Sequence, residues 1–234
     1  MAAVVITGVS RGLGAALFDA CNARGDRILA VGRRFSDAQR IARDARPQDI
    51  NLHATDLADP RWLPDGDILR PFLRESPEAV LIHNAAVVDP IGAVGKLPEE
   101  TVLNAIAVNL TAPILMTNNF LRSVPRDASR IRIVFISSGA ARRVVDGWSL
   151  YCATKAGAEM FFDVVSSQVI DDRRVSVVSV DPGQMDTEMQ STIRRAAGSG
   201  AFFPDQQRWL DAHDNGTLAD PRAVAEEIVK EHLS

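Results

Sequence analysis

Short apolar runs rich in β-branched residues alternate with longer amphipathic stretches through most of this 234-residue chain. The apolar runs predict strands at 3–6, 27–31, 50–53, 79–82, 131–136 and 174–179. The amphipathic stretches between them predict helices at about 13–24, 36–45, 99–123 and 150–168. Strands separated by helices in this rhythm pair in parallel, and their uniformly apolar composition indicates a sheet covered on both faces. We therefore predict an α/β fold with a doubly wound parallel sheet, built as a single domain over residues 1–234.

Composition narrows the possible partners. The chain is 46% hydrophobic, enough to bury one large core, and its net charge of −4 comes from interspersed charges. This pattern argues against a nucleic-acid partner. Two distant cysteines, and histidines without ligand spacing, predict neither a disulfide framework nor a metal site. No basic leader precedes the first strand and no apolar run approaches the roughly 18 residues of a membrane span, so we expect a cytoplasmic protein without a membrane partner.

A glycine-rich turn follows the first predicted strand and opens the first predicted helix. Its sequence from residue 7 is Thr-Gly-Val-Ser-Arg-Gly-Leu-Gly. Glycines there permit a tight turn and let backbone N–H groups and the helix N-terminus approach a pyrophosphate. An ordinary turn is the alternative, but the position between strand and helix favours a nucleotide site. We expect cofactor contacts from Gly8, Ser10, Arg11, Gly12, Leu13 and Gly14.

The end of the second strand indicates which dinucleotide binds. An acidic residue at this place reads the adenosine ribose 2′-hydroxyl, whereas an arginine accommodates a 2′-phosphate. Here the strand ends in Val-Gly-Arg-Arg, without a carboxylate. Arg33 and Arg11 together form a candidate phosphate clamp, although both are also compatible with solvated surface charges. We predict NADP(H) rather than NAD(H) as the cofactor.

Further strand ends add weaker signals. Asp56 and Leu57 follow the third strand and are candidates to meet the adenine edge, while Asn84 and Ala85 end the fourth strand with small residues that let a cofactor approach. An ordinary strand-end turn is the alternative at each of these two places. The segment at about 184–217 looks irregular yet carries two phenylalanines and a tryptophan, which predicts either a substrate lid or packing back on the core.

Tyr151 and Lys155 are the candidates for acid–base chemistry. They lie four residues apart on a predicted helix and therefore share one face. Because a nearby ammonium favours phenolate, we predict that the pKa of Tyr151 lies below its usual value of about 10. Ser138 ends the fifth strand, at the edge where parallel sheets bind ligands. Asn109 lies inside an apolar helical stretch and needs a partner, for which water is one candidate.

These motifs together resemble the short-chain dehydrogenase/reductase family. The resemblance rests on Thr-Gly-x-x-x-Gly-x-Gly at 7–14, Asn-Ala at 84–85, Asn109, Ser138, Tyr-x-x-x-Lys at 151–155 and Asp-Pro-Gly at 181–183, in the family's order and spacing. It implies a Rossmann-like sheet and a proton relay in which Tyr151 is the general acid and Ser138 holds the substrate carbonyl. Lys155 would lower the pKa of Tyr151 and, like Tyr151, contact the cofactor, while Asn109 would anchor a relay water. Pro182 and Gly183 would contact the cofactor, and Thr187 would contact its nicotinamide carboxamide.

Two stretches, 151–156 and 181–190, resemble the sepiapterin reductases and bacterial benzil reductases within that family. Those relatives reduce vicinal dicarbonyl or α-hydroxyketone compounds with NADPH, so a small-molecule carbonyl is the expected substrate. We expect the substrate pocket to include Val144, Val145, Trp148 and Met185, with an ordinary core role as the alternative. The chain departs from the family's Asn-Asn-Ala-Gly at two positions, where it has His83 and Ala86.

Two further functions remain compatible with these motifs. A 3-oxoacyl-carrier-protein reductase or alcohol dehydrogenase of the same family is one, and only Arg142-Arg143 hints at a basic docking patch for an acidic carrier. A dinucleotide sensor without catalysis is the other, but it has no need for the proton relay. The resemblance also implies a homodimer or homotetramer built on the helices at about 99–123 and 150–168.

Overall fold

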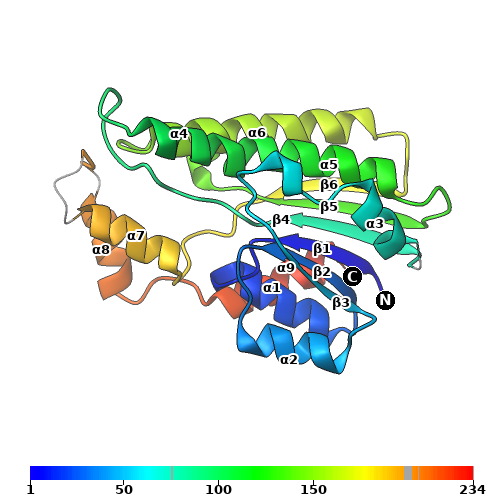
Figure 1. Ribbon diagram of the computed structural model, residues 1–234. Coiled ribbons are helices and arrows are strands. Elements are labelled where there is room, and N and C mark those ends of the chain that lie inside the picture. The colour runs from blue at the N-terminus through cyan, green and yellow to red at the C-terminus, as the bar shows by residue number, and fades with distance from the viewer. Residues whose placement is uncertain (75, 198–201, 205, 234) are drawn as a thin grey trace.

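A six-stranded parallel sheet organises the computed structural model, which describes residues 1–74, 76–197, 202–204 and 206–233. The strands run in the order β3-β2-β1-β4-β5-β6, so the direction of winding reverses between β1 and β4 (Figure 1). Their bounds are β1 Ala3–Thr7, β2 Arg27–Gly32, β3 Ile50–Ala54, β4 Glu78–His83, β5 Arg130–Ile136 and β6 Val175–Val180. All six predicted strands are confirmed, and most of their ends differ from the prediction by one residue.

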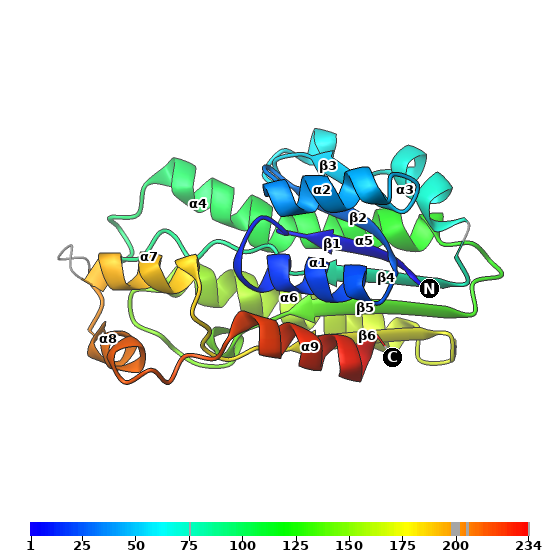
Figure 2. The same ribbon diagram turned by 90° about the horizontal axis from the view of Figure 1, so that it is seen from below.

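Helices cover both faces of the sheet, which confirms the doubly wound single-domain α/β prediction. One face carries α1 (Gly12–Ala23), α2 (Asp37–Ala45) and α9 (Pro221–His232), seen from below in Figure 2. The other carries α3 (Gly66–Leu73), α4 (Glu99–Ile106), α5 (Ala112–Ser123) and α6 (Ser149–Gln168). Alternate strand residues feed two separate cores: Val5 packs toward the α5–α6 side, and its neighbours Val4 and Ile6 pack toward α1 and α9.

The helical stretch 99–123 is not one uniform helix. A π-helical turn, Ala107–Thr111, separates α4 from α5. Pro113 follows it and has no N–H to donate to the carbonyl of Asn109, which removes one α-helical hydrogen bond at this point.

The same stretch corrects the expectation that no segment reaches membrane length. Glu99–Ser123 spans 25 residues with a mean hydropathy of 1.2 in its most apolar window, enough to pass as a membrane span by length and composition. Met116 and Phe120 of α5, however, are buried in the sheet core. Core helices pass the same test, so this is weak support for a membrane role.

The prediction of an irregular segment at 184–217 is wrong. It contains α7 (Glu188–Ala197) and α8 (Gln206–Asp214), which project beyond the sheet on the left of Figure 1, while residues 198–201 and 205 lie outside the described part. Phe203 is buried, and with Trp209 it packs against Trp148, so the second alternative, packing back on the protein, is supported. Helices α3 and α9 and the 3-10 turn Pro60–Trp62 were also absent from the prediction.

Candidate active site

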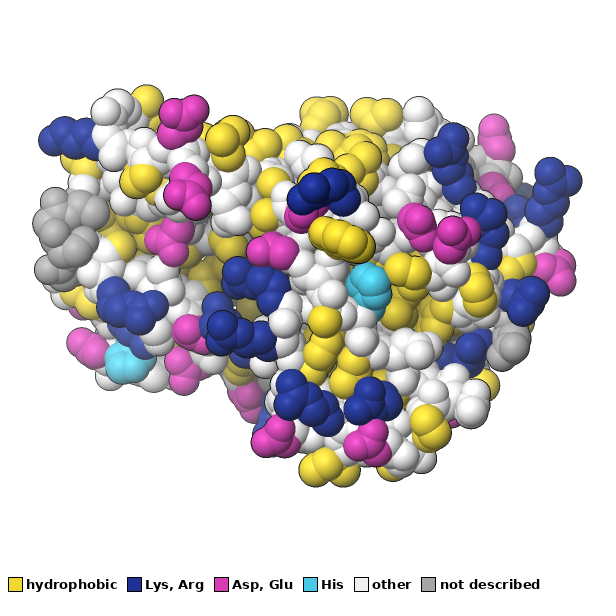
Figure 3. All heavy atoms as spheres, viewed as in Figure 1, with side chains coloured by type: hydrophobic (Ala, Val, Ile, Leu, Met, Phe, Trp, Pro, Cys, Tyr) yellow, Lys and Arg dark blue, Asp and Glu magenta, His cyan; other side chains and the backbone are white. Residues whose placement is uncertain are grey.

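A cavity of about 870 Å³ opens at the carboxyl ends of the strands, and residues of α7 and α8 line part of it. Figure 3 shows the surface hollowed beside these helices, with Lys and Arg side chains at its edge. The cavity lies where the strand order reverses, the place where open parallel sheets bind ligands. The structure brings nearly all predicted site residues to it: Gly8, Ser10, Arg11, Gly12, Leu13, Gly14, Arg33, Asp56, Leu57, Asn84, Ala85, Ser138, Val144, Val145, Trp148, Tyr151, Lys155, Pro182, Gly183, Met185 and Thr187.

The glycine turn is shaped by close contact with the end of β4. Gly8 has a φ of +72°, and a Cβ on it would lie 2.7 Å from the Cα of Ala85. A Cβ on Gly14 would lie 2.1 Å from the carbonyl oxygen of Gly8. The Asn84 side-chain amide donates to the carbonyl oxygens of Thr7 and Gly8, each at 3.1 Å. Side chains are excluded here, which leaves the turn's backbone facing the cavity.

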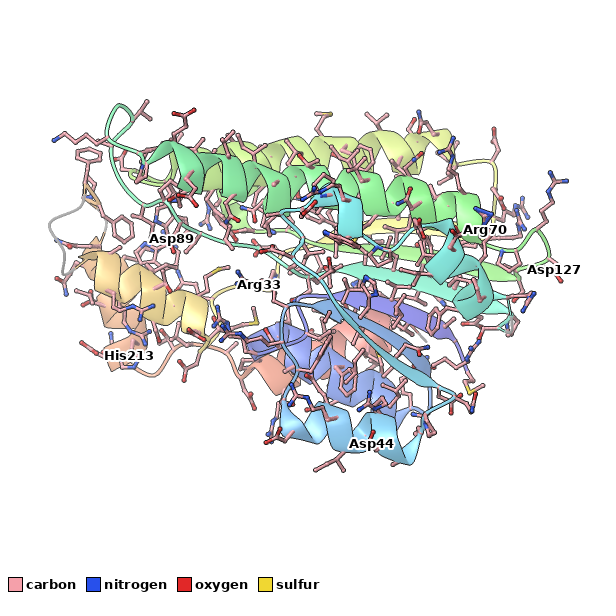
Figure 4. The ribbon with its side chains drawn as sticks, viewed as in Figure 1. Arg33, Asp44, Arg70, Asp89, Asp127 and His213 are labelled. Atoms are coloured by element: carbon pink, nitrogen blue, oxygen red, sulfur yellow. The ribbon has the colours of Figure 1, made fainter. Side chains whose placement is uncertain are left out.

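Two arginines with different surroundings reach the predicted phosphate site. Arg33 is exposed and extends from the end of β2 toward α7 (Figure 4). Arg11 forms an exposed ion pair with Glu188, the first residue of α7. Asp56 accepts a hydrogen bond from the backbone N–H of Ala58, which closes its strand-end turn. Within the described part of the chain, the Arg33 guanidinium has no ion-pair partner and can bind a phosphate directly, whereas Arg11 would first have to leave the carboxylate of Glu188.

Tyr151 is almost fully buried and hydrogen-bonds to Ser138. Burial raises the pKa of Tyr151 to about 12, the Ser138 hydrogen bond lowers it, and the charges of Asp181 and Cys152 raise it further. The prediction of a lowered pKa is therefore wrong. Helical spacing alone does not reveal that the phenol is desolvated, which disfavours its charged form.

Lys155 also differs from its predicted role in this structure. Its Nζ donates to the carbonyl oxygen of Ile136 at 2.7 Å and lies 5.8 Å from the centroid of the Tyr151 ring. Burial lowers the pKa of Lys155 to about 8, although the carboxylates of Asp181 and Glu159 oppose the shift. With its pKa near 8, Lys155 is already neutral at the pH where the Tyr151 phenolate would form, so it does not stabilise that phenolate.

Asn109 does not reach the cavity. It is 2% exposed, and its side-chain amide donates to the carbonyl of Val87 at 2.8 Å and to Thr154 Oγ1 at 3.2 Å. Its side-chain oxygen accepts from the N–H of Val87 at 2.8 Å. Both amide hydrogens are taken by protein atoms, so the side chain positions the irregular segment that follows β4, and the suggested water partner stays a prediction.

Comparison with known proteins identifies the family. The short chain dehydrogenase family matches residues 2–198. The chain belongs to the short-chain dehydrogenase/reductase family. It is 30% identical over 229 residues to a benzil reductase ((S)-benzoin forming) from Bacillus cereus, covering 96% of this chain and 91% of that protein. It is 31% identical over 212 residues to the sepiapterin reductase of Meriones unguiculatus, covering 84% and 79%.

Solved structures agree with this assignment. The KRED1-Pglu enzyme superposes with a TM-score of 0.83 at 26% identity, covering 98% of this chain and 94% of that one. A short-chain dehydrogenase/reductase from Burkholderia vietnamiensis superposes with a TM-score of 0.68 at 30% identity, covering 94% and 96%. Members of this family are oxidoreductases that act on CH–OH or C=O groups with a nicotinamide dinucleotide, and this chain is one of them.

The residues at the cavity fit a dinucleotide of this kind. Glycines line the turn that faces the pyrophosphate position, and a Cβ on Gly12 would lie 3.1 Å from the Cγ2 of Thr187, so the two cofactor segments meet across the cavity. Arg33 supplies a cation at the cavity edge. Within the described residues, no group of three or more His, Cys, Asp or Glu side chains could hold a metal ion.

An aromatic cluster forms the substrate end of the cavity. The Trp148 ring lies 5.5 Å from that of Tyr151 and 4.6 Å from that of Trp209, centroid to centroid. The indole N–H groups of Trp148 and Trp209 are both buried, and neither has a hydrogen-bond partner among the residues that the structure describes. Val145 packs against this cluster, whereas Val144 is 92% exposed at the rim.

Several lining residues escaped the sequence analysis. They include Val88, Asp89, Arg143, Met189, Ile193 and Arg208. The first two follow β4 in a loop, and the last three belong to α7 and α8, the helices that the sequence pattern missed. Arg143 directly precedes Val144, a predicted substrate residue, and this position was the signal that could have indicated it.

Proposed function

We propose that this protein is an NADPH-dependent carbonyl reductase whose substrate is a vicinal dicarbonyl or an α-hydroxyketone, with Tyr151 as general acid. The observation that carries the proposal is the hydrogen-bonded pair of Tyr151 and Ser138 at the aromatic end of the cavity. Two adjacent hydroxyls suit a carbonyl oxygen that gains negative charge. The similarity to benzil and sepiapterin reductases supports the substrate class.

Each residue then has a defined task. With a pKa near 12, Tyr151 carries its proton at neutral pH and can give it to the carbonyl oxygen. Ser138 donates a second hydrogen bond to that oxygen, and Lys155 lies next to the phenol as the neighbouring proton carrier. The cofactor supplies the hydride when bound. Asn109 acts by holding Val87, and the relay water that the family resemblance implies stays a prediction.

Arg33 supports NADPH as the preferred cofactor. Its guanidinium is exposed where a 2′-phosphate would lie, and no carboxylate follows β2 at that place. A relative from Schizosaccharomyces pombe, 26% identical over 231 residues, is named an NADP-dependent 3-hydroxy acid dehydrogenase.

The basic pair behind the carrier-protein alternative is partly engaged within the protein. Arg142 is bound by both carboxylate oxygens of Glu159 although its side chain is 66% exposed, and Arg143 donates to the carbonyl of Gly139. Cytoplasmic location and assembly as a homodimer or homotetramer through α4–α6 complete the proposal.

The deciding experiment follows NADPH oxidation with 1,2-diketones, sepiapterin-like pterins and 3-oxoacyl thioesters. We expect turnover of the first two classes, and Tyr151→Phe should lower kcat by at least about 100-fold because no proton donor remains. Turnover of thioesters alone would overturn the dicarbonyl assignment. Full activity in Tyr151→Phe would overturn the role of Tyr151.

A further inference from the structure

A buried carboxylate lies next to the catalytic pair on the same helix. Glu159 follows Lys155 by one turn of α6 and Tyr151 by two, so the three side chains share one face. Glu159 is only 7% exposed. A buried carboxylate is costly unless it is paired and hydrogen-bonded, so its partners indicate why it is retained.

Those partners flank Ser138 in the sequence. Glu159 Oε1 accepts from Ser137 Oγ at 3.1 Å and from Arg142 Nη2 at 2.6 Å. Glu159 Oε2 accepts from Arg142 Nε at 3.0 Å, which makes the arginine pair bidentate. The short segment 137–142, which leaves β5 and forms the 3-10 turn Gly139–Ala141, is therefore tied at both ends to one carboxylate on α6. Ser138 lies inside this clamp.

We propose that Glu159 is a positioning residue of the active site, which holds Ser138 opposite Tyr151 and supplies a negative charge facing Lys155. The proposal rests on the proposed function, because it assumes that Ser138 and Tyr151 act on the substrate carbonyl. The clamp of Ser137, Arg142 and Glu159 sets the separation of the two hydroxyls by attaching one segment to the helix that carries the other. A small displacement of such a pair is enough to slow a reaction strongly.

The charge of Glu159 adds an electrostatic role. Lys155 is buried among His83 at the end of β4, Asp181 after β6, and Tyr151 and Glu159 on its own helix. His83 is neutral at physiological pH because burial lowers its pKa to about 3. Asp181 and Glu159 are therefore the charges that raise the pKa of Lys155 against the effect of burial. Removing Glu159 should shift the Lys155 titration to lower pH.

The test uses three variants of the full chain: Glu159→Gln, Ser137→Ala and, as control, Asp49→Asn. Glu159→Gln removes the charge, and Ser137→Ala removes one arm of the clamp but keeps the charge. Asp49 is a matched control because its carboxylate pairs with Arg46 at 3.2 Å next to β3, away from the cavity lining. The chain has only three lysines, Lys96, Lys155 and Lys230, so ¹³C NMR of labelled lysine can follow the Lys155 titration directly.

We expect Glu159→Gln to lower the Lys155 titration by about one pH unit and to lower kcat by about tenfold or more, with KM for NADPH within about twofold. Ser137→Ala should lower kcat while leaving the titration in place, and Asp49→Asn should change neither. The proposal fails if Glu159→Gln has the same kcat and the same Lys155 titration as Asp49→Asn. If Glu159→Gln does not fold, Ser137→Ala decides instead, and full kcat in that variant overturns the proposal. A wild-type protein that reduces no carbonyl compound would instead refute the proposed function, and the NMR titration would still test the electrostatic role.

Discussion

Tyr151 shows how burial can override a helical side-chain pair. The spacing of Tyr151 and Lys155 predicted a phenol with a lowered pKa, but the two groups are buried together, and each then loses its charged form more easily. Lys155 Nζ also donates a hydrogen bond to the carbonyl oxygen of Ile136. The free protein therefore holds a protonated tyrosine, suited to donate a proton in the reductive direction.

The Tyr151 pKa can be measured without ambiguity, because this is the only tyrosine in the chain. We expect near-ultraviolet titration of the folded protein to show phenolate only near pH 12. The denatured chain should titrate near pH 10, the ordinary value for tyrosine. Since the folded pKa is raised, this group's contribution to stability should be lost as pH rises above about 10.

Tyr151→Phe provides the blank for this titration, since it removes the whole signal. Half-ionisation of the folded wild-type protein at or below about pH 10 would contradict the assigned effect of burial.

His83 should make the protein sensitive to acid. The ring is buried, shares a 2.9 Å hydrogen bond with Thr117 Oγ1, and has a pKa lowered to about 3. Below about pH 6.5 the His83 imidazole takes up a proton in the unfolded chain but not in the folded protein. The free energy of unfolding should therefore fall from that pH toward pH 3. Between pH 7 and pH 5 we expect a loss of about 2 kcal/mol in the free energy of unfolding by urea.

His83→Asn should remove that pH dependence, because asparagine does not titrate. His213→Asn, at an exposed position on α8, is the matched control and should retain it. Equal pH dependence in the two variants would show that His83 is not the source.

At the scale of elements, the end of β2 carries the predicted preference for NADPH. We expect Arg33→Ser to lower kcat/KM for NADPH by about ten- to a hundredfold, since a charge-assisted contact to phosphate is worth about 1.5–3 kcal/mol. The value for NADH should stay within about threefold, because NADH has no phosphate at this place. Steady-state kinetics with both cofactors measures the difference.

Arg40→Ser offers the matched control, because Arg40 is an exposed arginine on α2 whose ion-pair partner is Asp37 on the same helix. Its cofactor preference should equal that of the wild type. A wild-type enzyme that uses NADH as well as NADPH would contradict the prediction for Arg33.

At the scale of the whole molecule, the outer face of α4 and α6 predicts assembly. Leu103 and Met160 are 61% and 63% exposed, and Val164 is about half exposed on the same side as Met160, one turn further along α6. We expect sedimentation to show a dimer or tetramer, and Met160→Glu with Val164→Glu to give a monomer, because two charges would be buried at the interface.

Ile41→Glu tests whether any exposed apolar residue would have the same effect. Ile41 is 68% exposed on α2, on the opposite side of the sheet. Its variant should assemble like the wild type, and a monomeric wild-type protein would refute the predicted interface.

Local patterns predicted much of this protein. The six strands, their parallel pairing and the two covered faces follow from runs such as 3–6 and 131–136, since short, mostly apolar β-branched runs separated by helices are typical of a parallel sheet buried on both faces. Many of the residues that line the cavity followed as well, because strand ends of a parallel sheet meet at one edge. Helices α7 and α8 did not, because their few apolar side chains, which pack onto Trp148, lie in a stretch that is otherwise rich in Gly, Asp and Gln.

The sequence by itself determined which side chains gather at the carboxyl edge: the glycine turn, Arg33, Ser138, Tyr151 and Lys155. Only the tertiary structure decided their hydrogen-bond partners and their pKa values. The partners of Asn109 lie 22 and 45 residues away, and the clamp on Glu159 joins a strand end to a helix. The pKa values of Tyr151 and Lys155 depend on how completely other segments exclude water from them. Desolvation and hydrogen-bond partners are properties of the packed chain, and spacing within one helix does not contain them.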